Sequence, residues 1–199
     1  MAKATRRHGR EVGGRRGGKP PTLETERLRL TAPNVRHAAG LFAYGSRKEF
    51  TAFIDSAPLR TKKEAERFAQ SLAADNKSGR RLYWVAELLE DKRAVGTLGF
   101  IFSFSPRHRV AEFGYGFAPE TWGTGLFSEA AKAIVAFGFT KLGLRRIQAI
   151  TRATNIRSIK GAEKIGFRQE AVLAEFYQDA DGSRCDAVVL ALLAPRRRR

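Results

Sequence analysis

The sequence predicts an α/β fold of the α+β kind, in which a mixed, mostly antiparallel central sheet of about seven strands is flanked by about four helices. Two observations lead to this prediction. Three strand-like runs between residues 82 and 118 are separated only by short turns, which is typical of an antiparallel meander. Strand and helix patterns then alternate to the end of the chain, which favours a mixed sheet covered by helices.

The individual elements follow from the spacing of apolar residues, which alternates in strands and follows the helical turn in helices. Strands are expected over 26–31, 82–89, 94–104, 109–118, 145–151, 167–176 and 184–193, and helices over 34–45, 61–79, 126–141 and 155–165. Asn34 is placed to cap the first helix, and Thr61 with Glu64 forms a capping box at the start of the second. Pro33 ends the first strand, and Gly166 ends the last helix.

Length and composition point to one globular domain over residues 23–195. Hydrophobic residues make up 43% of the 199, enough for a core, and no apolar run approaches the roughly 20 residues of a membrane span. A single cysteine, Cys185, excludes an internal disulfide and a cysteine-based zinc cluster. His8, His37 and His108 lack the paired spacing of metal ligands, so we expect no metal. Without an apolar signal segment, a cytoplasmic location is the default expectation.

The strong positive charge is concentrated at the two ends of the chain. Of the formal +17, residues 1–22 contribute +6 and residues 196–199 contribute +4, which leaves +7 on the domain. Residues 1–22 are expected to be a disordered basic tail and residues 196–199 a basic C-terminal tail, and arginine-rich tails favour phosphate backbones such as those of RNA or the ribosome. The alternative is a solubilising extension, or an incorrectly placed start site, at the N-terminal end.

The segment 113–130, FGYGFAPETWGTGLFSEA, carries the strongest chemical signal. A buried strand leads through a glycine-rich turn into a helix, whose first turn offers N–H groups without intrahelical partners. Glycines allow close approach to the backbone, and the helix dipole favours an anion such as a phosphate. The segment has no lysine of a Walker loop and no third glycine of a dinucleotide fingerprint. Alternatively, the glycines make only a tight turn.

Four segments, in order along the chain, resemble the motifs of one protein family. Residues 23–30 look like its L-x-T-x-R-L-x-L entry strand, and 113–130 match its strand and glycine turn. Residues 155–167 resemble its N-x-x-S/A…E-K-x-G-F signature, and 182–186 its closing G-x-x-x-D hairpin. This family is the GNAT superfamily of acetyltransferases, in its RimJ/RimL-type branch. The resemblance covers 23–193.

The resemblance implies a fold that binds acetyl-CoA as co-substrate. Main-chain N–H groups after the fourth expected strand would hold the CoA diphosphate, the pantetheine arm would run along the end of that strand, and an asparagine would bind the arm from the other side. The residues that this assigns to the cofactor are Phe117, Ala118, Trp122, Gly123, Thr124, Gly125, Leu126, Phe127, Ser128, Asn155 and Ser158. Two of them depart from the family loop: Trp122 replaces Gln or Arg, and Phe127, which would crowd the diphosphate, replaces Gly or Ala.

The same resemblance suggests catalytic residues. Many relatives protonate the leaving thiolate with a tyrosine, but Ala162 stands at that position here. RimL-like enzymes use a serine and a glutamate instead, which correspond to Ser158 as the thiolate's hydrogen-bond donor and Glu175 as base or amine anchor. Glu112 is a second candidate base, because strand alternation places it on one face with Gly114 and Gly116, which suggests an open channel. Either glutamate would otherwise be a solvated strand carboxylate, and Ser158 a helix-start hydroxyl.

The resemblance therefore predicts an N-acetyltransferase whose acceptor, by direct attack, is a protein N-terminal α-amine of the ribosomal-protein-alanine or -serine type. At pH 7.5 roughly one-third of such amines are neutral, against about one lysine side chain in a thousand, so a weak base suffices. The alternatives are an acetyltransferase for a small amine, such as an aminoglycoside, polyamine or amino acid, and a catalytically weak protein that binds RNA or the ribosome. The protein would be a monomer or a homodimer. The aromatic residues of the strands, including Tyr83 and Tyr115, are expected in the core; the alternative is that Tyr83 or Tyr115 lines the acceptor groove.

Overall fold

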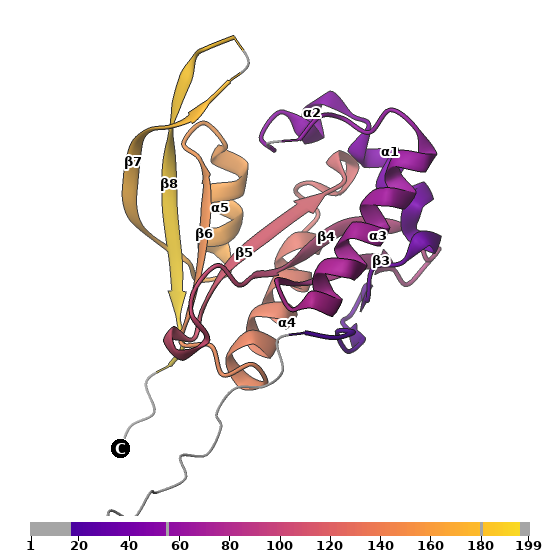
Figure 1. The fold of residues 1–199 in the computed structure, drawn as a ribbon, viewed down its shortest axis with the longest axis horizontal. Helices are drawn as coiled ribbons and strands as arrows, with labels where there is room; N and C mark the ends of the chain where they lie inside the picture. Colours follow the sequence, from indigo (N-terminus) through magenta and orange to yellow (C-terminus); the bar gives the residue numbers. More distant parts are fainter. Residues whose placement is uncertain (1–16, 55, 180, 196–199) are drawn as a thin grey trace, which may run out of the picture.

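A computed structural model describes residues 17–54, 56–179 and 181–195. These form one sheet in the order β1-β2-β3-β4-β5-β6-β8-β7, which is antiparallel except where β5 pairs with β6 (Figure 1). The strands are β1 (Leu23–Glu24), β2 (Leu28–Thr31), β3 (Arg81–Leu88), β4 (Ala94–Ile101), β5 (Val110–Phe117), β6 (Arg146–Arg152), β7 (Arg168–Gln178) and β8 (Arg184–Leu193). The helices are α1 (Ala38–Gly45), α2 (Lys48–Thr51), α3 (Lys62–Ser78), α4 (Leu126–Thr140) and α5 (Ile156–Lys164), with short 3-10 turns at Val35–His37, Pro106–His108 and Pro119–Thr121.

Helices cover both faces of the sheet. Figure 1 shows α1 and α3 on one side of the sheet and α4 on the other, and α5 packs against α4. On the α4 side, the Trp84 ring lies 5.4 Å from Phe137 and 6.4 Å from Phe100. Trp84 and Phe100 are fully buried. A sheet with helices on both faces agrees with the predicted mixed sheet covered by helices.

Local signals explain where the helices begin and end. The Thr61 side chain accepts the Glu64 N–H at the start of α3, and Gly79 ends that helix in the left-handed conformation. Asn34 caps the 3-10 turn that precedes α1, so the expected helix over 34–45 begins with a tighter turn. The structure adds two short elements to the prediction, the two-residue strand β1 and the single turn α2.

The N-terminal segment differs from its prediction where the structure describes it. Residues 17–22 were expected to belong to a disordered tail, but the Gly18 N–H donates to Asn76 O, and the Trp84 indole donates to Pro21 O at 2.8 Å. Because a buried indole N–H needs an acceptor, this bond attaches the segment to the core. The remaining predictions about the two tails fall on residues 1–16 and 196–199, outside the described residues.

The feature that positions the site is a divergence of two neighbouring strands. β5 and β6 pair in parallel only at 110–112 with 146–148, and Glu112 opposite Gln148 is the last pair. Beyond it, residues 113–117 of β5 pair with β4 on one side only. Their outward backbone groups therefore need other partners.

Within the described ranges, no helix is long and apolar enough to cross a membrane.

Candidate functional site

The loop that follows β5 is shaped by two glycines. Gly123 has φ +80° and Gly125 has φ +86°, left-handed conformations that favour glycine. Space is open around Gly123, since a Cβ built there would meet nothing within 4 Å. The Trp122 indole donates to the Phe117 carbonyl at 2.9 Å and ties the loop to the end of β5. The loop thus presents its backbone, and α4 begins directly after it.

Five main-chain N–H groups in this loop and in the first turn of α4 have no acceptor among the described residues. Trp122 and Thr124 donate to carbonyls of the preceding turn, but no described residue accepts from the N–H groups of Gly123, Gly125 or Leu126–Ser128. They gather at the positive end of a 15-residue helix. Donors arranged in this way form a site for an anion such as a phosphate.

Two residues of the entry segment hold this loop in place. The Thr25 hydroxyl and the Arg27 N–H donate to Glu129 Oε1 at 2.6 and 2.7 Å, and the Arg27 guanidinium pairs with Glu129 and donates to Thr124 O. Partial burial alone would raise the pKa of Glu129, but these hydrogen bonds hold that pKa below its usual value. Sequence reasoning noted the T-x-R pattern without its role, which is to clamp the first turn of α4.

Phe127 and Trp122, the two departures in the loop, both contact α5. The Phe127 ring centroid lies 4.3 Å from that of Tyr115, and the ring packs against Gly161. The Arg157 guanidinium lies 3.7 Å from the Trp122 ring centroid, a cation–π contact. Both contacts connect the loop region to the helix across from it.

Three polar side chains meet at the start of α5: Asn155, Ser158 and Tyr115. Asn155 caps the helix by accepting the Ser158 N–H at 3.2 Å, and its Nδ2 donates to no described residue. The Ser158 hydroxyl lies 2.8 Å from the hydroxyl of Tyr115 on β5. Tyr115 was expected in the core, with a place in the acceptor groove as the alternative, and it packs on Phe113 and Phe127 and faces α5. No sequence pattern indicates this pair, because the contact depends on how α5 crosses β5.

The opposite face of β5 carries the glutamate predicted from alternation. Glu112 is half-buried and shares its face with Gly114 and Gly116. The expected open channel over these glycines is wrong in detail. A Cβ on Gly114 would overlap the Tyr83 hydroxyl, and one on Gly116 would lie 2.9 Å from the Phe50 ring. The glycines therefore make room for aromatic side chains from β3 and α2.

Burial controls the titration of the groups on this face. Desolvation raises the pKa of Glu112, although the Arg81 guanidinium opposes the shift. Desolvation also raises the pKa of Tyr83 to about 12, so its phenol is neutral at physiological pH. A carboxylate whose pKa is raised binds a proton more tightly than an exposed one does, which suits Glu112, at the point where the strands diverge, to act as a base.

Glu175, the other candidate base, lies elsewhere. It sits at a bulge of the edge strand β7 with φ +49°, its N–H donates to Asp186 Oδ1, and its carboxylate pairs with Arg184 at 2.6 Å. Its side chain is 63% exposed. Asp186, from the closing motif, thus stabilises a strained bulge. The structure gives no contact between Glu175 and either Ser158 or Glu112.

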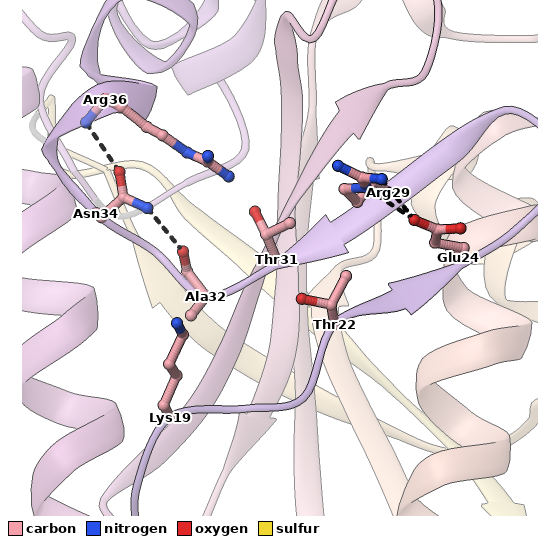
Figure 2. A pocket seen from close by; sticks show the side chains of 8 residues that line it. All are labelled: Lys19, Thr22, Glu24, Arg29, Thr31, Ala32, Asn34 and Arg36. Carbon is pink, nitrogen blue, oxygen red and sulfur yellow. Dashed lines mark hydrogen bonds and ion pairs between the residues drawn. The ribbon is translucent and has the colours of Figure 1, made fainter.

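A separate polar region lies at the β1–β2 edge, at the other end of the strand order. A hollow of about 400 Å³ lies there, and Figure 2 shows the side chains that line it: Lys19, Thr22, Glu24, Arg29, Thr31, Ala32, Asn34 and Arg36. Beneath it, buried His37 lies 3.2 Å from Glu87 and 3.3 Å from Thr31. Burial lowers the pKa of His37, and Arg36 adds to this, while Glu87 opposes it. The network satisfies buried polar groups, and it is remote from the divergence of β5 and β6.

Comparison with known proteins agrees with this geometry. The family model described as an acetyltransferase (GNAT) domain matches residues 27–168. The chain is 34% identical over 176 residues to the uncharacterized N-acetyltransferase YoaA of Bacillus subtilis (strain 168), covering 88% of this chain and 98% of that protein. It is 39% identical over 71 residues to the spermidine N(1)-acetyltransferase of Escherichia coli (strain K12), 35% of this chain and 38% of that protein.

Solved structures share the fold at low sequence identity. An acetyltransferase (GNAT family) from Bacillus anthracis is 24% identical with a TM-score of 0.76, and the match covers 87% of this chain and 98% of that one. A putative ribosomal-protein-serine acetyltransferase from Vibrio cholerae is 20% identical with a TM-score of 0.75, covering 87% and 97% of the two chains.

Proposed function

The chain belongs to the GNAT acetyltransferase family, whose members transfer acetyl from acetyl-CoA to an amine, and we propose that its acceptor is a protein N-terminal α-amine. The observation that carries the acceptor class is the composition of the Glu112 face of β5. Glu112 is a half-buried carboxylate close to Arg81, whose guanidinium also pairs with Asp75 at 3.4 Å. Such a site suits a single amine that needs little help to lose a proton.

Acetyl-CoA fits the loop after β5. The unpaired N–H groups of Gly123, Gly125 and Leu126–Ser128 would bind its diphosphate. The outward backbone groups of β5 up to the Phe117 N–H would bind the pantetheine arm, whereas the Phe117 carbonyl already accepts from the Trp122 indole at 2.9 Å. The Ala118 N–H contributes nothing, because it already donates to Val95 O at 2.8 Å. When bound, acetyl-CoA supplies a thioester whose carbonyl carbon forms a bond to the amine nitrogen as its bond to sulfur breaks.

On the donor side of β5, two groups of α5 would serve the bound thioester. The free Nδ2 of Asn155 would donate to a carbonyl of the arm. The Ser158 hydroxyl would hydrogen-bond to the sulfur as negative charge develops on it. Both groups project from one helix turn whose cap fixes their positions.

Glu112 is the better candidate base. It stands at the last paired position before β5 and β6 diverge, and burial raises its pKa. It would take the proton that the amine loses, directly or through one water. Glu175 is exposed and ion-paired with Arg184 on the edge strand, so it would serve as an amine anchor on the rim.

The charge of the domain opposes a polycationic acceptor. Residues 23–195 carry a formal net charge of +7. A surface of this sign repels polyamines and aminoglycosides at long range. The similarity to the spermidine enzyme covers 71 residues only. A peptide N-terminus brings one charge, and reference pKa values leave a substantial part of it neutral near pH 7.5.

Acetylation assays over a panel of amines test the acceptor class. We expect the highest kcat/KM for peptides with a free N-terminal Ala or Ser, and none for the same peptides with a blocked N-terminus and an internal lysine. A preference for spermidine, an aminoglycoside or a free amino acid would overturn the proposal.

Thermal melting tests donor binding separately. At about 100 times its Kd, acetyl-CoA should stabilise the fold by roughly 2.7 kcal/mol. The absence of both this shift and any acetylation would favour a binding protein without catalysis. RNA binding that falls steeply with salt and is lost on deletion of residues 1–16, which leaves the attached residues 17–22 in place, would assign the deleted segment a role.

A further inference from the structure

A hydroxyl pair bridges β5 and α5 on the donor side of the divergent strands. Tyr115 Oη lies 2.8 Å from Ser158 Oγ and 3.2 Å from the Ser158 carbonyl oxygen. The short distance between two hydroxyl oxygens means that either can donate to the other. When Tyr115 donates to Ser158 Oγ, the serine hydrogen is free for a third group.

The surroundings of this pair are apolar. The Tyr115 ring packs on Phe113 at 5.3 Å and on Phe127 at 4.3 Å between centroids. Ala162, one turn further along α5, is buried and brings no hydroxyl. In such an environment a hydrogen bond between two hydroxyls is stronger than in water and its geometry is fixed.

We propose that Tyr115 is a positioning residue that acts through Ser158, renewing the proton that the serine hydroxyl gives to the departing sulfur. This inference rests on the proposed acetyl transfer. A phenol has a reference pKa of about 10, close to the value of about 8.5 for a thiol, whereas an aliphatic alcohol is far less acidic. The serine alone is therefore a poor acid, and the phenol behind it makes the transfer feasible.

The protons balance along this chain of groups. The amine loses one proton, which Glu112 accepts and passes to solvent. The sulfur gains one from Ser158 Oγ, and Ser158 takes the Tyr115 hydrogen in its place. Tyr115 regains a proton from solvent before the next turnover. Burial raises the pKa of Tyr115, although its hydrogen bond with Ser158 opposes the shift, so the phenol is protonated at the start of each turnover.

Titration of bound CoA tests the pair without any acceptor. The ultraviolet absorbance of the thiolate is followed against pH in the complex with CoA, with desulfo-CoA as the blank. We expect Tyr115→Phe, which keeps the packed ring, and Ser158→Ala each to raise the apparent pKa of the bound thiol. Ser158→Thr, which keeps a hydroxyl, should restore the wild-type value.

Turnover gives the second readout. We expect Tyr115→Phe to lower kcat by about 100-fold, the lower end of the range for acid–base groups. The double variant should be no slower than Ser158→Ala, because the two residues form one relay. The control is Tyr44→Phe, which removes the hydroxyl of another buried tyrosine and should change neither readout.

The outcomes separate the two proposals. An unchanged thiol titration and kcat in Tyr115→Phe would overturn the relay, as would effects of the two single variants that multiply in the double variant. Should Tyr115→Phe fail to fold, Ser158→Ala against Ser158→Thr tests the same pair, and equal thiol pKa values in these two would overturn it. Failure of the acceptor assignment alone leaves the CoA titration unaffected.

Discussion

The two faces of β5 differ in almost every property although their residues alternate along one strand. One face carries Glu112 and two glycines, which leave room for the aromatic rings of Tyr83 and Phe50. The other carries Phe113, Tyr115 and Phe117, which pack beneath α4 and α5.

This difference separates the two proton transfers of the proposed reaction. A base is needed where the amine enters, and an acid where the thiolate leaves. Strand alternation places these groups on opposite sides of one backbone, so that neither neutralises the other. Variants that affect one face and spare the other test this division.

Glu112→Gln should have the largest effect, because it removes the base and keeps the size of the side chain. We expect kcat/KM for the acceptor to fall by about 10²–10⁴-fold, while the melting shift with acetyl-CoA is unchanged. The control is Glu24→Gln on β1, whose carboxylate pairs with Arg29 at the opposite end of the strand order. In a plot of kcat/KM against pH, the variant should lose the acidic limb, along which the rate of the wild type rises as its base is deprotonated.

Glu175→Gln sharpens the same comparison. If Glu175 were the base, its variant would show the larger fall, and the assignment of the amine side of β5 to Glu112 would be wrong. Unchanged rates in both variants would end the base hypothesis altogether.

Glycine-to-alanine changes on the two sides should affect different substrates. A Cβ on Gly116 would lie 2.9 Å from Phe50, and a Cβ on Gly161 would lie 3.1 Å from Phe127. Such overpacking typically costs about 1–3 kcal/mol. We expect Gly116→Ala to raise KM for the acceptor by about tenfold, and Gly161→Ala to raise the Kd of acetyl-CoA instead. Equal effects of either variant on both substrates would contradict the division between the faces.

Much of the fold follows from the sequence because its signals are local. Strand β8 has the predicted bounds 184–193, and α3 begins and ends at its predicted capping residues, Thr61 and Gly79. The short elements β1 and α2 were missed because two to four residues carry no periodicity. They form because neighbouring strands and helices offer partners.

The site was less predictable because it depends on how distant segments meet. Alternation placed Glu112 with Gly114 and Gly116, but the rings that fill the space above them come from β3 and α2. The Tyr115–Ser158 contact joins residues 43 apart in sequence. Glu175 lies on β7, which the sheet order places at the edge, beyond β8. No sequence spacing encodes that order.

A matched pair of glycines tests the loop on the donor side. Gly125 has φ +86° and Gly143 has φ +65°, so alanine at either position is strained by about 1–2 kcal/mol. We therefore expect similar losses in the free energy of unfolding. Only Gly125→Ala should weaken acetyl-CoA binding, because it displaces unpaired N–H groups, whereas Gly143 lies in the turn before β6. Equal acetyl-CoA Kd values in the two variants would argue against the loop as the diphosphate site.

The smallest expected effect is on stability: Glu112→Gln, which should lower activity, should raise the free energy of unfolding. Because burial raises the folded-state pKa of Glu112 above its usual 4.5, the folded state binds the proton more tightly than the unfolded chain does. The free energy of unfolding therefore falls as pH rises from about 4.5 through the raised pKa. Glu112→Gln removes this dependence, so denaturant melts should show the variant more stable than the wild type at pH 7 and the difference shrinking toward pH 4. If the variant were instead less stable than the wild type at pH 7, the ionised Glu112 carboxylate would stabilise the fold. Its pKa would then not be raised by burial, and this argument for Glu112 as the base on this face of β5 would fail.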